Sequence, residues 1–155
     1  MEMLIRPASE DEYDEAMELV WTVFSRFNAP EYSEEGVKKF RQFLDDATLR
    51  KMFRTGDYRI FVFTAGDRIE GVISLRNNNH ISLLFVDEKY QKKGIGSRLL
   101  RYLCSYCKDW EDQEFITVNS SPYAVGFYHK YGFRDTDTVK FSDGISYTPM
   151  RYLLD

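Results

Sequence analysis

The chain has 155 residues and a formal net charge of −4, with 21 basic against 25 acidic side chains. Hydrophobic residues make up 43% of the chain and charged residues 30%, which fits one domain with its own core and excludes a disordered or fibrous protein. No apolar run reaches the roughly 18 residues that a membrane span needs. The N-terminus lacks the basic and apolar stretches of a secretory signal, so we expect a cytoplasmic protein without a membrane partner.

The first 57 residues predict one strand followed by helices. Residues 3–6 are a short apolar strand, and Ser9 begins a capping box that opens a helix. Apolar residues then recur at three- and four-residue steps until residues 28–30, where a proline ends the helix. A second helix is expected after Ser33, because its first turn is acidic and suits the helix dipole. A shorter helix is expected around residues 48–54.

From residue 58 onward the hydrophobic period changes from that of a helix to that of a strand. Residues 58–64 and 69–75 are rich in β-forming side chains and flank a glycine turn. The asparagines at 77–79 predict a second turn, since asparagine tolerates the left-handed conformation, and residues 80–86 follow as a third strand. These segments predict an antiparallel meander of three strands.

The remaining segments alternate between helix and strand. A helix carrying residues 99–107 precedes a strand at 115–119, and a β-α-β step of this kind implies a parallel pair of strands. A helix at 122–131 and two strands, at 137–141 and 145–153, complete the chain. Since no repeat or linker interrupts it, we expect a single α+β domain over residues 1–155.

Cys104 and Cys107 form a C-x-x-C pair, which is compatible with a redox site or half of a zinc site. At helical spacing, however, both thiols fall on the same stripe as Leu99 and Leu103, which favours burial in the core. The two histidines, His80 and His129, are far apart and do not complete a zinc motif, so we expect no metal site.

The charge of the chain is unevenly distributed. Residues 1–57 carry 8 basic and 13 acidic side chains, whereas residues 58–155 carry 13 and 12. Five of the basic residues in the second part lie within 89–101, which creates a local positive field in an acidic protein. Because a nucleic-acid-binding domain is usually basic over a broad face, we expect no nucleic-acid partner.

The most specific pattern is the glycine-containing junction at residues 91–97, between the third meander strand and the next helix. Backbone N–H groups at a helix start, combined with the helix dipole, bind anions, and Gly94 and Gly96 keep side chains out of the way. A P-loop is excluded because its G-x-x-x-x-G-K-[ST] pattern is absent. A dinucleotide fingerprint is excluded because Leu99 stands where its third glycine would be.

Two motifs resemble those of one known superfamily. The run LFVDEKYQKKGIGSRLL, residues 84–100, closely resembles the acyl-CoA-binding motif of the GNAT N-acetyltransferases. The run AVGFYHKYGF, residues 124–133, is similar to the motif that follows it in that superfamily, a helix with a tyrosine that ends in Gly-Phe. The predicted order of elements is also that of the superfamily, so the resemblance covers nearly the whole chain.

The resemblance implies a GNAT-like mixed sheet, mostly antiparallel, with helices on both faces and one parallel strand pair that splays apart at an acyl-CoA site. It implies acetyl-CoA as co-substrate and no metal. The residues that it assigns to acetyl-CoA binding are Leu84, Phe85, Val86, Gln91, Lys92, Lys93, Gly94, Ile95, Gly96, Ser97, Asn119 and Ser121. Ser121 is a departure, because many members place an asparagine seven residues before the tyrosine.

The chemistry of amine acetylation adds candidate catalytic residues. Tyr128 matches the tyrosine of the superfamily and is the candidate proton donor to the departing thiolate. His80 stands where some members place a glutamate that acts as the general base. The ordinary pKa of histidine, near neutrality, suits a proton acceptor, although a strand-end histidine beside a turn is an equal alternative. Glu70 and a water molecule are the other candidate bases.

The function implied is direct transfer of an acetyl group from acetyl-CoA to a primary amine in a ternary complex. The acidic N-terminal segment suggests a small cationic amine as acceptor. The alternatives are a protein or peptide N-acetyltransferase and a catalytically silent acyl-CoA-binding sensor. Dimers are common in the superfamily, and a homodimer is therefore an expectation.

Overall fold

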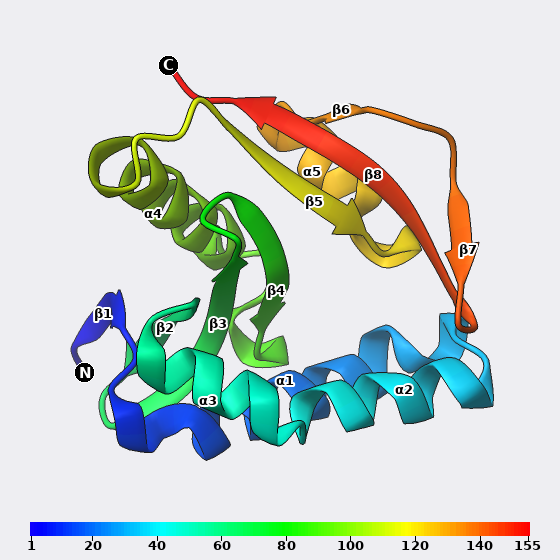
Figure 1. The fold of residues 1–155 in the computed structure, drawn as a ribbon. Helices are drawn as coiled ribbons and strands as arrows, with labels where there is room; N and C mark the ends of the chain where they lie inside the picture. Colours follow the sequence, from blue (N-terminus) through cyan, green and yellow to red (C-terminus); the bar gives the residue numbers. More distant parts are fainter.

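The structure, a computed structural model, describes residues 1–155. An eight-stranded mixed sheet carries helices on both faces (Figure 1). The strands are β1 (Met3–Pro7), β2 (Tyr58–Ala65), β3 (Arg68–Arg76), β4 (His80–Val86), β5 (Phe115–Ser120), β6 (Arg134–Asp135), β7 (Lys140–Ser142) and β8 (Ile145–Leu153). The helices are α1 (Tyr13–Phe27), α2 (Glu34–Leu44), α3 (Ala47–Thr55), α4 (Ile95–Trp110) and α5 (Val125–Tyr131). None of these helices combines the length and the apolar character that crossing a membrane requires.

Local hydrogen bonds fix the starts of the N-terminal helices. The backbone N–H of Ser9 donates to the Glu12 carboxylate at 2.8 Å, and a 3-10 turn leads from there into α1. The Ser33 hydroxyl accepts a hydrogen bond from the Gly36 N–H at 3.0 Å and caps α2. The predicted helix starts at Ser9 and Ser33 are therefore confirmed, with the first turn at Ser9 in 3-10 rather than α form.

The sheet is antiparallel except at one pair of strands. Its strand order is β1-β2-β3-β4-β5-β8-β6, with β7 paired to β8. β4 and β5 are parallel, as predicted, but only His80–Thr117 and Ile81–Val118 face each other in register. Beyond these two pairs the strands diverge, so the sheet splits into two halves (Figure 1). The split leaves one edge of β4 without a partner strand at residues 82–86.

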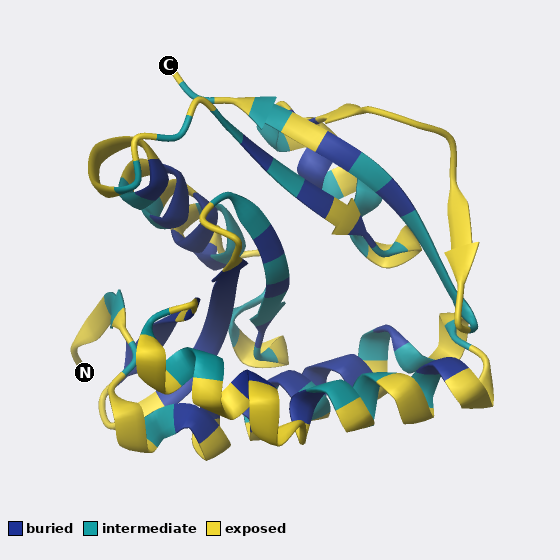
Figure 2. Cartoon of the chain, in the orientation of Figure 1, coloured by how far each residue is buried: buried dark blue, intermediate teal, exposed yellow.

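Alternating side chains of the central strands fill a core on each face of the sheet. On β2, Ile60 and Val62 lie in the core cluster that also holds residues of α1 and α3, while Phe61 and Phe63 lie in the cluster with α4, as the period of two requires. β3 is buried along nearly its whole length (Figure 2). Each large apolar side chain buried here contributes about 1.5–3 kcal/mol to stability.

Both cysteines lie in the core on the α4 side, as predicted. Cys104 and Cys107 are buried and form no disulfide. Burial raises the pKa of the Cys104 thiol to about 11 and that of Cys107 to about 12. Thiols held neutral in this way are poor nucleophiles, so the packing interpretation of the C-x-x-C pair holds.

The C-terminal part differs from the prediction in two places. The strand expected at 137–141 is shorter and shifted: β6 ends at Asp135, and β7, which pairs with β8 as predicted, begins only at Lys140. Residues 136–139 are exposed, and Asp137 pairs with Lys140 at 2.8 Å, which closes a local turn instead of a ladder. The helix expected from Pro122 starts instead as a 3-10 turn and becomes α-helical at Val125.

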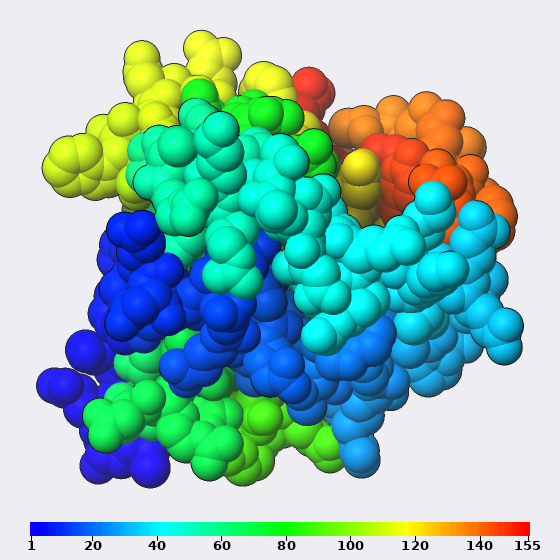
Figure 3. Space-filling model, turned by 60° about the horizontal axis from the view of Figure 1, so that its bottom comes forward, coloured from blue at the N-terminus to red at the C-terminus, as the bar shows by residue number.

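The β7–β8 hairpin contacts helix α2, and so links the half of the sheet that contains β8 to the N-terminal helices. It extends from β8 to the start of α2, where the N–H of Ser33 donates to the carbonyl of Gly144 at 3.4 Å. A Cβ on Gly36 would lie 2.7 Å from that carbonyl oxygen, so the approach requires glycine. Figure 3 shows the orange hairpin lying against the cyan start of α2.

Candidate active site

The splitting of β4 from β5 opens a cleft of 820 Å³. Eleven of the fourteen residues predicted for the site line it: Leu84, Phe85, Val86, Gln91, Lys92, Gly94, Gly96, Ser97, Asn119, Ser121 and Tyr128. Lys93, Ile95 and His80 do not. Lys93 instead packs over the Tyr90 ring, and Ile95 is buried in the core. The split sheet therefore gathers residues from two motifs that lie about thirty positions apart in the sequence.

The loop before α4 turns sharply so that the start of the helix faces the cleft. Lys92 has a φ of 61° and Gly94 a φ of 81°, and two left-handed residues so close together reverse the chain within one turn. The N–H groups of Ile95, Gly96 and Ser97 precede the first intrahelical bond, and no side chain caps them. These donors and the positive end of the helix dipole make this part of the cleft suited to an anion.

Glycine at position 96 also allows close packing of the loop on α5. A Cβ on Gly96 would lie 3.3 Å from the Phe127 ring of α5. The loop and α5 consequently lie close together, and a larger residue would push them apart. The Gln91 side chain supports the same loop, since its amide donates to the Val86 carbonyl at 2.9 Å.

Three basic side chains line the cleft without forming an ion pair. Lys92 comes from the loop, Arg101 from α4 and Lys130 from α5. No Asp, Glu or His is among the lining residues. The charge of the cleft is thus purely positive, in a protein whose net charge is −4. An unpaired cationic lining attracts a polyanionic ligand.

Tyr128 lies deep in the cleft, with its ring held by aromatic neighbours. Phe127 and Phe133 contact the ring edge-on at centroid distances of 5.2 and 5.1 Å. The side chain is 4% exposed, and no protein group hydrogen-bonds its hydroxyl. Burial strongly raises the pKa of this phenol, so it carries its proton at neutral pH. The hydroxyl is therefore free to donate a proton into the cleft.

His80 and Glu70 occupy other places. His80 lies at the closed end of the parallel pair, where its Nδ1 and the Thr117 hydroxyl are 2.8 Å apart. Desolvation, and secondarily the charge of Arg76, lowers the pKa of His80. Glu70 is buried on β3, with its carboxylate 3.5 Å from Arg68 and 3.6 Å from Lys89. Neither residue lines the cleft, and the catalytic role of His80 remains a prediction.

The placement of His80 predicts a pH effect on stability. Because the folded chain lowers the pKa below its ordinary value of 6.5, the unfolded chain binds the proton more readily. Stability contributed by neutral His80 is present above about pH 6.5 and declines as the pH falls. In His80→Asn, whose amide can still meet Thr117, we expect the melting temperature to fall less between about pH 7 and pH 5 than in the wild type. Calorimetric melting over that pH range measures the two melting temperatures. An equal fall in melting temperature for the variant and the wild type would contradict the prediction.

Several cleft residues were not predicted from the sequence. Asn28 caps the end of α1, Tyr32 follows the next turn and Phe40 lies on α2, and all three line the cleft. Asn28 is buried, and its amide donates to the Ser121 hydroxyl at 3.3 Å across 93 positions of sequence. The only local signal was that Asn28 is a polar residue at the end of an apolar helix face, which also describes an ordinary helix cap.

Comparison with known proteins identifies the family. The family model described as "Acetyltransferase (GNAT) domain" matches residues 28–154. The chain is 28% identical over 109 residues to an uncharacterized N-acetyltransferase, YafP, of Escherichia coli, covering 70% of this chain and 64% of that protein. It is 35% identical over 81 residues to the UPF0157 protein YqkA of Bacillus subtilis, covering 50% of this chain and 24% of that protein. The chain thus spans less than two thirds of either relative.

Two solved structures share the fold over almost the entire chain. The PaiA N-acetyltransferase of Thermoplasma acidophilum, in complex with coenzyme A, has a TM-score of 0.80 at 22% identity and covers 99% of both chains. A spermidine N-acetyltransferase of Vibrio cholerae has a TM-score of 0.68 at 18% identity, covering 98% of this chain and 94% of that one. The family match over residues 28–154 shows that this chain belongs to the GNAT family of acetyltransferases.

Proposed function

We propose that the protein transfers an acetyl group from acetyl-CoA directly to a primary amine. The observation that carries the proposal is the pairing, in one cleft, of the uncapped start of α4 with the unbonded hydroxyl of Tyr128. The start of α4 is suited to binding a pyrophosphate, and the Tyr128 hydroxyl is suited to protonating a departing thiolate. An extended thioester with a pyrophosphate midway along it would join the two.

The unpaired edge of β4 supports the binding of such an extended molecule. Residues 82–86 have a partner strand only on the β3 side, so every second residue along this edge directs its backbone N–H and C=O groups away from β3, without a ladder partner. Lys92 and the first N–H groups of α4 would hold the pyrophosphate. Arg101 and Lys130 add positive charge along the same cleft. Asn119 and Ser121 lie across the split and would contact the pantetheine arm from the β5 side.

The proposed reaction needs three things from the protein. The amine nitrogen forms a bond to the thioester carbonyl carbon, and the carbon–sulfur bond breaks. The backbone N–H near Val86 would polarise the carbonyl oxygen. Tyr128 would give its hydroxyl proton to the departing thiolate, and burial, which raises the pKa of this phenol, keeps the proton on it until the thiolate forms. Since no carboxylate or imidazole lines the cleft, the proton of the amine would leave through water.

The acceptor that we propose is a small cationic amine. The cleft is deep rather than flat, because α1 and α2 close it opposite the loop, and this favours a small molecule over a folded protein. The amine must lose a proton before it attacks, so a cleft that is already positive favours its neutral form.

Steady-state kinetics with acetyl-CoA and a panel of primary amines tests the proposal. Direct transfer predicts intersecting double-reciprocal lines, and it predicts no acetylated protein by mass spectrometry when acetyl-CoA is supplied alone. Parallel lines or a stable acetyl-protein would contradict direct transfer. Acetyl-CoA binding without transfer to any amine would instead identify an acyl-CoA sensor.

A further inference from the structure

The part of the cleft opposite the glycine loop is walled by aromatic rings. Tyr32, Phe40 and Phe85 line it, and we call these three residues the aromatic wall. Phe40 and Phe85 have a centroid distance of 6.0 Å. Behind the wall, Phe24 stacks on Phe40 at 4.0 Å and contacts Tyr32 edge-on at 5.0 Å. The wall is therefore fixed from behind by a fully buried ring.

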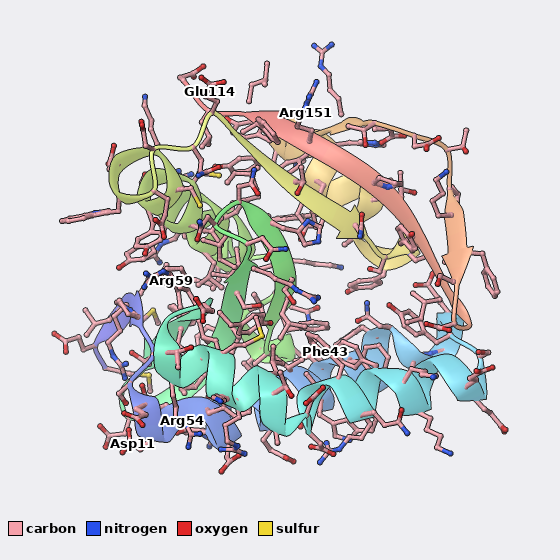
Figure 4. The ribbon with its side chains drawn as sticks, in the orientation of Figure 1. Asp11, Phe43, Arg54, Arg59, Glu114 and Arg151 are labelled. Carbon is pink, nitrogen blue, oxygen red and sulfur yellow. The ribbon has the colours of Figure 1, made fainter.

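Acidic side chains are numerous on the N-terminal helices but lie outside the cleft. Asp11, labelled in Figure 4, lies on the outer side of the molecule, away from the split between β4 and β5. Glu88 is paired with Arg26 at 2.6 Å. Glu31 precedes Tyr32 and acts on its phenol, whose pKa is raised mainly by burial and secondarily by this charge, but Glu31 does not line the cleft. The acidity of the N-terminal segment is thus a property of its solvent-facing surface.

A cleft of this composition suits one amine and disfavours several. Aromatic faces attract a single ammonium group and also bind an apolar body. Each additional ammonium group of a polycation would have to leave water without a carboxylate partner, since no Asp or Glu lines the cleft. The desolvation penalty grows with each extra ammonium group. The aromatic wall and the absence of carboxylates therefore both favour an acceptor with a single amine.

One polar group of the cleft is placed to orient the reacting amine. Asn28 lines the cleft close to the aromatic wall, and its amide nitrogen is engaged with Ser121. No protein group donates a hydrogen bond to its side-chain oxygen, Oδ1. A neutral acceptor of this kind matches an amine N–H without adding charge to the cleft.

We propose that the acceptor is a monoamine with an aromatic or apolar body, held by Tyr32, Phe40 and Phe85 and oriented by Asn28. This inference rests on the proposed function and makes that function more specific, because it names the class of acceptor. It separates the chain from polyamine and aminoglycoside acetylation, for which the cleft offers no carboxylate.

The test compares two classes of amine with the full-length protein. Phenethylamine and tyramine serve as monoamines, spermidine and kanamycin as polycations, and release of the CoA thiol reports transfer. We expect kcat/KM to be at least about tenfold higher for the monoamines. Equal or higher values for spermidine or kanamycin would overturn the inference while leaving the proposed function intact. Transfer to none of the amines, despite acetyl-CoA binding, would overturn both.

A variant of the aromatic wall gives a second test with a matched control. Phe40→Leu keeps an apolar side chain and removes the ring face, and we expect KM for phenethylamine to rise roughly tenfold. Phe53→Leu makes the same change at a half-buried ring on α3 that does not line the cleft. Acetyl-CoA affinity, measured by calorimetry, should equal that of the wild type in both variants and reports correct folding. A KM in Phe40→Leu no higher than in the control would refute the role of the wall.

Discussion

Replacing Gly94 with aspartate is expected to weaken acetyl-CoA binding roughly 30- to 150-fold relative to Gly94→Asn. Gly94 has a φ of 81°, a conformation that asparagine and aspartate both tolerate better than other side chains. A Cβ at this position would have no atom within 4 Å, so neither substitution meets a clash. The two variants therefore differ in one negative charge beside the proposed pyrophosphate site. Repulsion between the aspartate carboxylate and an adjacent pyrophosphate in a partly solvated cleft amounts to about 2–3 kcal/mol.

Calorimetric titration of both variants with acetyl-CoA and with CoA measures the difference. Raising the salt concentration to about 0.5 M should reduce the difference in affinity between the two variants, because mobile ions screen charges at the mouth of a cleft. Thermal melting controls for any cost of the substitutions to the turn, which should be the same in both. Equal dissociation constants for Gly94→Asp and Gly94→Asn would place the pyrophosphate elsewhere.

The elements with a regular hydrophobic period were predictable, because burial of one face imposes that period on the sequence. The meander from Tyr58 to Val86 and the core stripe of α4 follow this rule, and the structure confirms both. The parallel pairing of β4 and β5 was predictable from the β-α-β order alone. Residues 137–139 were predicted as part of a strand because an exposed loop with Thr and Val has the composition of an edge strand.

The two sides of the cleft differ in how much of them the sequence could predict. The loop side is a contiguous run in which glycines, basic residues and a helix start occur together, so local chemistry identifies it. The opposite side depends on contacts such as that between Asn28 and Ser121, which are 93 positions apart. The aromatic wall is hidden for another reason: Phe40 follows the same helical spacing as the core residue Leu44, and periodicity cannot separate a cleft wall from a core.

His80 illustrates a limit of counting along a strand. Its position relative to Gln91 suggested a catalytic base, but only the register shows that β4 is paired to β5 at His80 and free at Leu84 to Val86. The base candidate therefore lies at the closed end of the split, beside Thr117. Register between parallel strands depends on the whole crossover, which a local pattern does not encode.

Tyr128→Phe is expected to lower kcat for acetyl transfer roughly 100- to 1,000-fold, the size of effect usual for a general acid. The substitution removes one oxygen and leaves the ring between Phe127 and Phe133 in place. Since the hydroxyl bonds to no protein group, its removal leaves no buried partner unsatisfied, and the melting temperature should change little. The dissociation constant of acetyl-CoA should stay within about twofold of the wild type, because the lost interaction forms only as the thiolate departs.

A matched control, rather than the pH profile, separates a proton donor from a generally structural tyrosine. Burial raises the pKa of Tyr128, so its hydroxyl is protonated throughout the range in which amines are assayed, and its loss should lower the rate without moving the acid limb of the profile. Tyr102→Phe makes the same change at a half-buried tyrosine of α4 outside the cleft and should retain wild-type kcat. If Tyr128→Phe also retained wild-type kcat, the thiolate would have to leave unprotonated or take its proton from water. The cleft would then act by binding and orientation alone, which can by itself supply a large part of the rate enhancement.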